Sequence, residues 1–200
     1  MEKPIEILIA GDIGSGKTTF AGYLTELYKI PVFNSDKEAK KIYRDQKILA
    51  NINEIVGGGI IKEDGTLNNM ALATIIFNDD LKRQKLEMII HPKVRDQFEI
   101  WKKEQNSLIV AKESAIALKN GRDGVDFVII VEASEPIRIE RVMNRDHTTR
   151  ENVLARIQSQ SINYYSLADF IISNESDLLS LKNSVDNVIN EISKRIDYSI

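Results

Sequence analysis

The sequence contains no cysteine and only two histidines among its 200 residues. The absence of cysteine excludes disulfide bonds, thiolate-bound metals and cysteine nucleophiles, and it fits a reducing compartment. With two histidines and no cysteine, a zinc site is a poor interpretation. No apolar run approaches the ~20 residues of a membrane-spanning helix, and no signal-type segment is present. We therefore expect a cytoplasmic protein without a membrane anchor.

Positive charge is not in excess either, because 27 Lys and Arg residues are outnumbered by 30 Asp and Glu residues. A net charge of −3 argues against a surface for general nucleic-acid binding, so basic residues should act locally. Two hundred residues fit one globular domain with lobes inserted into it. We expect a monomer or a weak homo-oligomer.

A glycine-rich loop lies near the start of the chain, Gly11-Asp12-Ile13-Gly14-Ser15-Gly16-Lys17-Thr18. It fits the phosphate-loop pattern of Gly, four free positions and Gly-Lys-Ser/Thr. The glycines allow backbone N–H groups to surround an anion, and the following helix adds its unpaired N–H groups. Lys17 is placed to reach nucleotide phosphates, and the Thr18 hydroxyl to bind Mg²⁺.

The sequence around the loop favours this interpretation over a tight turn that binds nothing. Residues 5–10 are typical of a buried strand, and residues 19–28 have the apolar spacing of an amphipathic helix. Strand, glycine loop and helix in this order are the context that makes the motif informative.

Strand and helix patterns alternate along the chain and predict an α/β fold. The expected strands are residues 5–10, 30–33, 108–111, 125–131 and 170–172, with 125–131 as a central strand. Such alternation predicts a parallel five-stranded sheet with helices on both faces. Together with the glycine loop, this indicates a three-layer fold of the P-loop nucleoside-triphosphate hydrolase type. Ligands of these sheets bind beyond the carboxyl ends of the strands.

Residues 36–104 show helical patterns without a strand pattern and are expected to form an inserted helical lobe. Helices are predicted near 68–78 and 80–90, a loop over 51–66, and a further helix that begins at His91-Pro92. The helix near 68–78 is expected to carry an apolar stripe of Met70, Ala73, Ile76 and Phe77.

Two carboxylates follow predicted strands, Asp36 after 30–33 and Glu113 after 108–111. At the carboxyl edge of the sheet, a carboxylate accepts a proton from an attacking hydroxyl or holds Mg²⁺ through water. The alternatives are that Asp36 only caps a helix and that Glu113 is an ordinary loop carboxylate. Both readings stay open at this stage.

The segment 138–156 is rich in arginine, and Arg138, Arg141 and Arg145 are spaced to share one helical face. They form either a lid that closes guanidinium groups over phosphates or a solvated surface balanced by acidic neighbours. His91 before Pro92 is either a ligand contact or part of an ordinary helix start.

At this point the ordered motifs resemble those of the dephospho-coenzyme A kinase family, nearly from end to end. The similar segments are Gly11–Thr19, Phe33–Ala39, Gly65–Leu67 with Ile76-Phe77, His91–Val94, Arg141 with Arg145, Arg156 and Gln160, and Ala168–Asn174. Only the phosphate loop is widely shared among other families, so the ordered set is specific.

The resemblance implies transfer of the γ-phosphoryl group of ATP to the ribose 3′-hydroxyl of dephospho-coenzyme A, the last step of coenzyme A synthesis, with Mg²⁺. It also implies a nucleotide-binding core of residues 1–35, 105–137 and 166–200, a helical coenzyme A domain of 36–104 and a lid of 138–165.

The resemblance implies a role for each matching residue. Asp36 would be the general base, and Arg141 and Arg145 would clamp phosphate with Lys17. The implied nucleotide-binding residues are Gly11, Asp12, Ile13, Gly14, Ser15, Gly16, Lys17, Thr18, Thr19 and Asn174. Mg²⁺ would be bound by Thr18 and, through water, by Glu113, and the acceptor by Asp36, His91 and Glu113.

Four residues depart from the family pattern. Asn34 stands where the family usually has an aspartate, Asn69 where it has an arginine, Arg138 where it has a glutamine, and Lys119 where it often has a glutamate. We expect Glu113 to carry more of the Mg²⁺ binding as a result, and activity to be retained.

Three alternatives remain beside this reading. Another small P-loop kinase would act on a nucleoside, nucleotide or sugar. A nucleotide-dependent switch would carry Asp-x-x-Gly and Asn/Thr-Lys-x-Asp motifs, which the chain lacks. A nucleotide-binding subunit without activity would result if the substrate lobe has decayed at Asn69 and Lys119.

Overall fold

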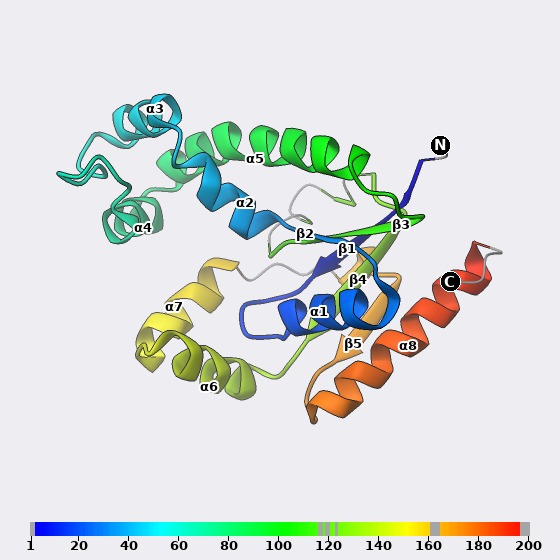
Figure 1. The fold of residues 1–200 in the computed structure, drawn as a ribbon. Helices are drawn as coiled ribbons and strands as arrows, with labels where there is room; N and C mark the ends of the chain where they lie inside the picture. The colour runs from blue at the N-terminus through cyan, green and yellow to red at the C-terminus, as the bar shows by residue number, and fades with distance from the viewer. Residues whose placement is uncertain (1–2, 116–117, 119–120, 123, 161–164, 197–200) are drawn as a thin grey trace. The chain divides into compact units, whose positions relative to one another are not determined.

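The computed structural model describes residues 3–115, 118, 121–122, 124–160 and 165–196, with only the backbone described at 159–160. The chain folds into two compact units (Figure 1). The first unit comprises Met1–Asn34 and Gln105–Ile200, and the second comprises Ser35–Glu104. Within the described part of the chain, no helix combines the length and apolar character needed to cross a membrane.

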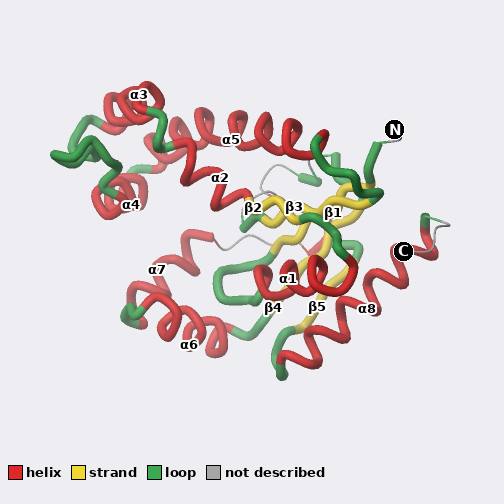
Figure 2. Tube along the Cα trace, in the orientation of Figure 1, coloured by secondary structure: helices red, strands yellow, loops and turns green. Residues whose placement is uncertain are grey.

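The first unit is built on a parallel five-stranded sheet, shown in yellow in Figure 2. Its strands are β1 (Ile5–Ala10), β2 (Val32–Asn34), β3 (Ile109–Glu113), β4 (Phe127–Glu132) and β5 (Phe170–Ser173). The order β2-β3-β1-β4-β5, with every pair parallel, confirms the predicted α/β fold.

Strand β4 pairs with a neighbour on each edge, β1 and β5, so the prediction that residues 125–131 form a central strand is confirmed. The middle strand of the five is β1. Hydrophobicity reports burial, and it does not distinguish the middle position from the next one.

Alternate residues of β1 enter cores on opposite faces of the sheet. Ile7 and Ile9 pack with Phe20 and Leu24 of α1 (Lys17–Tyr28) and with the apolar stripe of α8 (Leu178–Arg195). Leu8 lies in the core of the other face, which includes Leu118 and borders the short helix η2 (Tyr165–Leu167). This period-two alternation fixes which side of β1 faces each layer.

Helices α6 (Glu135–Asp146) and α7 (Arg150–Gln160) form a pair with its own small core. Pro136 lies in the first turn of α6, as predicted. Ile139 and Val142 pack with Val153 and Ile157, and Ile13 of the glycine loop packs against this cluster. The described helix pair is therefore in contact with the loop.

The second unit contains α2 (Ser35–Ile42), α3 (Gln46–Val56), α4 (Asn69–Asn78) and α5 (Asp80–Lys103). Its core residues are Ile42, Leu49, Ile52, Val56, Ile60, Leu72, Leu86 and Ile90. In its described residues, β pairing is limited to an isolated bridge between Ile61 and Leu67. The predicted helical character of this region is confirmed.

Two boundaries in the second unit differ from the prediction. The loop predicted for 51–66 begins only at Gly57, because α3 continues to Val56 and buries Ile52. The helix predicted to begin at His91-Pro92 does not exist as a separate element, because α5 runs through Pro92. Pro92 has no N–H to donate to the carbonyl oxygen of Met88, four residues earlier in the helix. Met88 is 68% exposed, so the helix loses this hydrogen bond at a position that water reaches.

The apolar stripe predicted for residues 68–78 is also not the buried face of α4. Met70 is 79% and Phe77 57% exposed, whereas Leu72 is 5% exposed and packs in the core. Helix α4 is apolar on most of its circumference, so its periodicity does not select the buried side.

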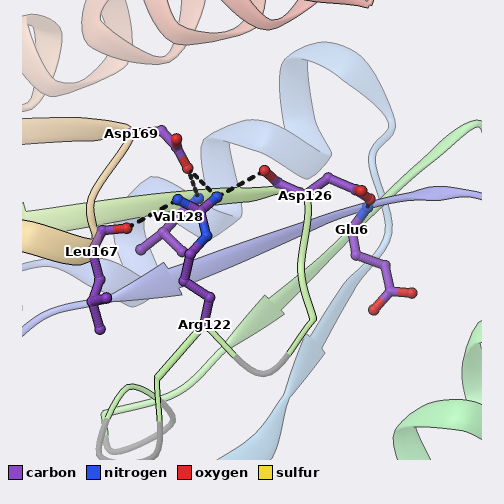
Figure 3. Close-up of polar contacts among 6 residues, drawn as sticks. All are labelled: Glu6, Arg122, Asp126, Val128, Leu167 and Asp169. Carbon is purple, nitrogen blue, oxygen red and sulfur yellow. Dashed lines mark hydrogen bonds and ion pairs between the residues drawn. The ribbon is translucent and has the colours of Figure 1, made fainter.

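A polar network ties β1, β4 and β5 together near their amino ends (Figure 3). Arg122 Nη2 donates to Asp169 Oδ2 at 2.6 Å and to the carbonyl oxygen of Asp126 at 2.8 Å. Asp169 Oδ2 also accepts from the backbone N–H of Val128, and Asp126 Oδ2 accepts from the N–H of Glu6. Each carboxylate thus bonds to a backbone N–H of an adjoining segment of the sheet.

We expect Asp169→Asn to lower the free energy of unfolding by about 1–2 kcal/mol at neutral pH, because Arg122 loses its charged acceptor. Burial opposes the charged form of Asp169, but bonds from Arg122 and Val128 and the Arg122 charge outweigh it and lower its pKa. The stabilisation is complete above the unfolded-state pKa and is lost as the pH falls through the lower native pKa.

Urea unfolding over a pH series measures this effect, and the gap between the two proteins should close in acid. The control is Glu191→Gln, which removes an exposed partner of Lys194 on α8 and should change stability by less than about 0.5 kcal/mol. Equal stability of Asp169→Asn and the unmodified protein at neutral pH would contradict the expectation.

Candidate functional site

The glycine loop lies between the end of β1 and the start of α1, and its backbone shape depends on glycine. Gly11, Gly14 and Gly16 have φ values of 140°, 80° and 100°. A Cβ atom at Gly16 would lie 2.1 Å from Nδ2 of Asn174, so a larger residue is excluded by contact as well as by conformation. The loop is thus built against its neighbours in the shape that surrounds an anion.

Lys17 is the first residue of α1, two residues before the predicted start, and its side chain lies over the loop. The residue is 8% exposed, and its Nζ donates to the carbonyl oxygen of Asp12 at 2.8 Å. This bond keeps the ammonium group beside the N–H groups at the start of the helix, where a phosphate is attracted.

Thr18, Glu113 and Asn34 form a hydrogen-bonded cluster beside the loop. Thr18 Oγ1 donates to Glu113 Oε1 at 2.5 Å, and Asn34 Nδ2 donates to Glu113 Oε2 at 2.6 Å. Glu113 ends β3, pairs in register with Asn34 and Ile9, and is 6% exposed. The alternative that Glu113 is an ordinary loop carboxylate is therefore wrong.

The donor set of this cluster suits Mg²⁺, which prefers hard oxygen ligands and usually keeps several waters beside phosphates. Thr18 offers a hydroxyl oxygen, and the buried Glu113 offers carboxylate oxygens for a bound water. Among the described residues, no group of three or more His, Cys, Asp and Glu side chains could hold a metal alone. The residues fit an ion held largely by a nucleotide.

Asn174 follows β5 and supports the loop from the other side. Its Nδ2 donates to the carbonyl oxygen of Ser15 at 2.8 Å, and the residue is 5% exposed. Arg141 Nη2 in turn donates to the carbonyl oxygen of Asn174 at 3.1 Å. This chain of contacts connects α6 to the loop through the end of β5.

The three arginines of α6 lie in different environments, although their spacing is that of one helical face. Arg138 is 8% exposed and Arg141 Nη1 is buried, whereas Arg145 is exposed and bonds to Asp146. That bond lowers the pKa of Asp146, and a second bond from Arg156 acts in the same direction. The solvated-surface interpretation fits Arg145 and does not fit Arg138.

A family model described as dephospho-CoA kinase matches residues 5–180 of the chain. The chain belongs to the dephospho-CoA kinase family. It is 35% identical over 178 residues to a dephospho-CoA kinase of Bacteroides fragilis, covering 86% of each protein.

Solved structures agree with this membership of the dephospho-CoA kinase family. The crystal structure of TT1252 from Thermus thermophilus has a TM-score of 0.83 and 27% identity, over 95% of this chain and 98% of that chain. A dephospho-CoA kinase from Campylobacter jejuni has a TM-score of 0.59 and 27% identity, over 96% of this chain and all (100%) of that chain.

Two predicted site residues of this dephospho-CoA kinase family member belong to the second unit. Asp36 is the second residue of α2 and therefore lies inside the first turn of the helix. It is exposed, and it follows Asn34 of β2 by two positions. His91 lies within α5 and is partly buried. Lys119 lies outside the described residues, and the side chain of Gln160 is likewise not described.

The predicted residues that the first unit brings together are those of the loop, Glu113, Asn174 and Arg141. Sequence reasoning missed the contact of Asn34 with Glu113 and that of Arg138 with Asp12. The first had a signal, because both residues closely follow predicted strands. The second had no signal, because no periodicity relates a loop residue to a helix more than a hundred positions away.

Proposed function

We propose that this protein transfers the γ-phosphoryl group of ATP to the ribose 3′-hydroxyl of dephospho-coenzyme A and so performs the last step of coenzyme A synthesis. The observation that carries the proposal is membership of the dephospho-CoA kinase family over residues 5–180. The arrangement of Lys17, Thr18 and Glu113 around the glycine loop supports it, because phosphoryl transfer depends on positioning and charge stabilisation at such groups.

In this proposal the loop N–H groups and Lys17 hold the phosphates of ATP. Lys17 exchanges the carbonyl oxygen of Asp12 for a phosphate oxygen, so its ammonium group is hydrogen-bonded before and after binding. Mg²⁺ would be held by Thr18 directly and by Glu113 through water, and when bound it supplies charge neutralisation on the phosphates. Asn34 holds Glu113 in place by its hydrogen bond.

Asp36 is proposed as the general base that accepts the proton of the attacking hydroxyl. Its position in the chain supports this role, because it follows the carboxyl end of β2, whose last residue contacts Glu113. A carboxylate within hydrogen-bond reach of the hydroxyl removes its proton as the new bond to phosphorus forms. His91 and Glu113 are proposed to contact the acceptor.

Residues 36–104 are proposed to form the coenzyme A domain, residues 138–165 the lid, and residues 1–35, 105–137 and 166–200 the nucleotide-binding core. We further propose the cytoplasm as the location, and a monomer or weak homo-oligomer as the assembly. Asn174 is proposed to border the nucleotide pocket, since its backbone N–H bonds to Glu132 and its side chain to the loop.

The test is a coupled ADP-release assay with ATP and dephospho-coenzyme A, run beside nucleosides, nucleoside monophosphates and sugars. Turnover is expected with dephospho-coenzyme A and Mg²⁺, with phosphate on the ribose 3′-oxygen of the product. Turnover with another acceptor, and none with dephospho-coenzyme A, would instead identify a different small P-loop kinase.

Glu113→Gln is expected to raise the Mg²⁺ concentration for half-maximal activity by about tenfold, because the group that orders the metal-bound water loses its charge. The amide keeps the size and an acceptor oxygen for Asn34. An Mg²⁺ titration at saturating ATP measures this, with Glu26→Gln, an exposed partner of Lys182, as the control. An unchanged Mg²⁺ requirement would remove Glu113 from the metal site.

Arg141→Ala is expected to lower kcat by about tenfold, with a smaller change in KM for the acceptor. Arg141 Nη1 is buried and makes no hydrogen bond within the described structure, so it is a donor available to a phosphate oxygen. Arg145 is already bonded to Asp146, so Arg145→Ala should have a smaller effect. Steady-state kinetics separate these outcomes, and an unchanged kcat for Arg141→Ala would make it a supporting residue only.

A further inference from the structure

An ion pair joins the glycine loop to α6. Arg138 Nη1 lies 2.9 Å from Asp12 Oδ2, and the side chain of Arg138 is 10% exposed while that of Asp12 is 37% exposed. Arg138 Nε and Nη1 have no hydrogen-bond partner of favourable geometry in the described structure. The contact is therefore mainly an attraction between a buried guanidinium and a partly exposed carboxylate.

The backbone around this pair is closely packed. A Cβ atom at Gly14 would lie 2.7 Å from the carbonyl oxygen of Arg138 and 3.0 Å from its Cα. The loop therefore meets α6 through the backbone at Gly14 and through the carboxylate of Asp12, in addition to the apolar contact of Ile13. This packing holds the backbone of Arg138 against the loop.

Asp12 places a negative charge within a loop built to bind anions. Its own carbonyl oxygen accepts the bond from Lys17 Nζ, so the carboxylate belongs to the residue against which the catalytic ammonium group rests. Asp12 and Glu132 both line a cavity of about 100 Å³ beside the loop, and Arg138 is the cationic residue among those that line it. Tyr165 bonds to Glu132, and this bond raises the pKa of the tyrosine.

A carboxylate at this place affects ATP binding in two ways if it is not neutralised. It repels the phosphates, because like charges repel one another over distances of about 8 Å at physiological salt. It also attracts the ammonium group of Lys17, so the phosphates must compete with the carboxylate for this group. The nearby guanidinium of Arg138 reduces both effects.

We propose that Arg138 is a positioning residue of the ATP site that neutralises Asp12, so that the loop and Lys17 remain available to the phosphates. This inference rests on the proposed function, and it adds a residue pair to the nucleotide site. Arg138 acts through Asp12 and not by contact with the substrate, so removing both charges together should cost less than removing the arginine alone.

The test compares Arg138→Gln, Asp12→Asn and the double variant by calorimetric titration with MgATP. Arg138→Gln is expected to raise the Kd for ATP by about tenfold, which corresponds to about 1.4 kcal/mol. Asp12→Asn removes the charge that Arg138 neutralises and keeps the loop backbone, so adding Arg138→Gln to Asp12→Asn should raise the Kd for ATP by less than about threefold. Lys194→Gln, which removes an exposed positive charge at the end of α8, is the charge-matched control.

Restored binding in the double variant separates charge compensation from a structural or direct role. If Arg138 held the fold or touched phosphate itself, the double variant would bind as weakly as Arg138→Gln, and the proposal would be overturned. An unchanged Kd for Arg138→Gln would overturn it as well.

Thermal unfolding of each variant is measured in parallel. If Arg138→Gln does not fold, Arg138→Lys takes its place, because it keeps the charge and should bind ATP within about threefold of the unmodified protein. A tenfold loss in Arg138→Lys would contradict neutralisation by charge. ATP binding by the unmodified protein without turnover of dephospho-coenzyme A would contradict the proposed function alone.

Discussion

Lys17→Met is expected to lower kcat/KM for ATP by about a thousandfold. Methionine matches the length of the lysine stem, so the buried position is filled while the charge on the transferring phosphoryl group loses its partner. The ammonium group rests 2.8 Å from the carbonyl oxygen of Asp12, and a thioether leaves that acceptor without its donor. Steady-state kinetics with varied ATP, together with calorimetric ATP binding, divide the loss between binding and turnover.

The matched control is Lys29→Met, at the other end of α1. Lys29 is exposed, and its Nζ bonds to the carbonyl oxygen of Glu26 on the same helix. Lys29→Met should leave kcat/KM within about twofold of that of the unmodified protein, because Lys29 is exposed at the end of α1 opposite the loop. A loss for Lys17→Met no larger than that of the control would remove the lysine from catalysis.

Asp36→Asn is expected to lower kcat by about a hundredfold while ATP binding stays within about twofold. The amide keeps the size of the side chain but, in the proposed mechanism, cannot accept the proton of the attacking hydroxyl. Because the loss is in proton transfer, the residual activity should rise with pH as the hydroxyl becomes easier to ionise. The kcat–pH profile therefore tests the role more directly than a single rate.

Glu38→Gln provides the comparison for Asp36, because Glu38 lies in the same first turn of α2 and pairs only locally with Lys41 at 2.7 Å. It should leave kcat and the pH profile unchanged. If Asp36→Asn also keeps near-normal kcat, the aspartate is a residue of the helix start and another group accepts the proton.

The sequence was sufficient for the sheet and for the loop, because both depend on local patterns. Apolar runs such as residues 5–10 predict buried strands, and the Gly-Lys-Thr end of the loop specifies its conformation. The position of Glu113 beside the loop could also be predicted, because parallel strands bring the residues at their carboxyl ends to one edge of the sheet.

Features that depend on competition between similar faces could not be predicted in this way. Helix α4 is apolar on several sides, so Leu72 became the buried residue while Met70 and Phe77 stayed exposed. Pro92 was expected to begin a helix because that is its favourable place, but the packing of Leu86 and Ile90 on one side and Val94 beyond it outweighs one lost hydrogen bond.

Long-range pairs of polar side chains were the other limit. Asp12 and Arg138 are separated by more than a hundred residues, and the charge pattern left open whether the arginines form a lid or a solvated surface. The burial of Arg138, which distinguishes it from Arg145 seven residues later, follows from the contact of α6 with Gly14 and Ile13. Such information exists only in the folded chain.

The close contact between Gly16 and Asn174 has a thermodynamic consequence for the nucleotide. Asn174 already holds the carbonyl oxygen of Ser15, so folding orders this part of the loop before a nucleotide binds. In the proposed ATP site, less of the free energy of phosphate binding is therefore spent on ordering the backbone, and more of it contributes to affinity. The buried side-chain amide of Asn174 thus links folding stability to the proposed nucleotide affinity.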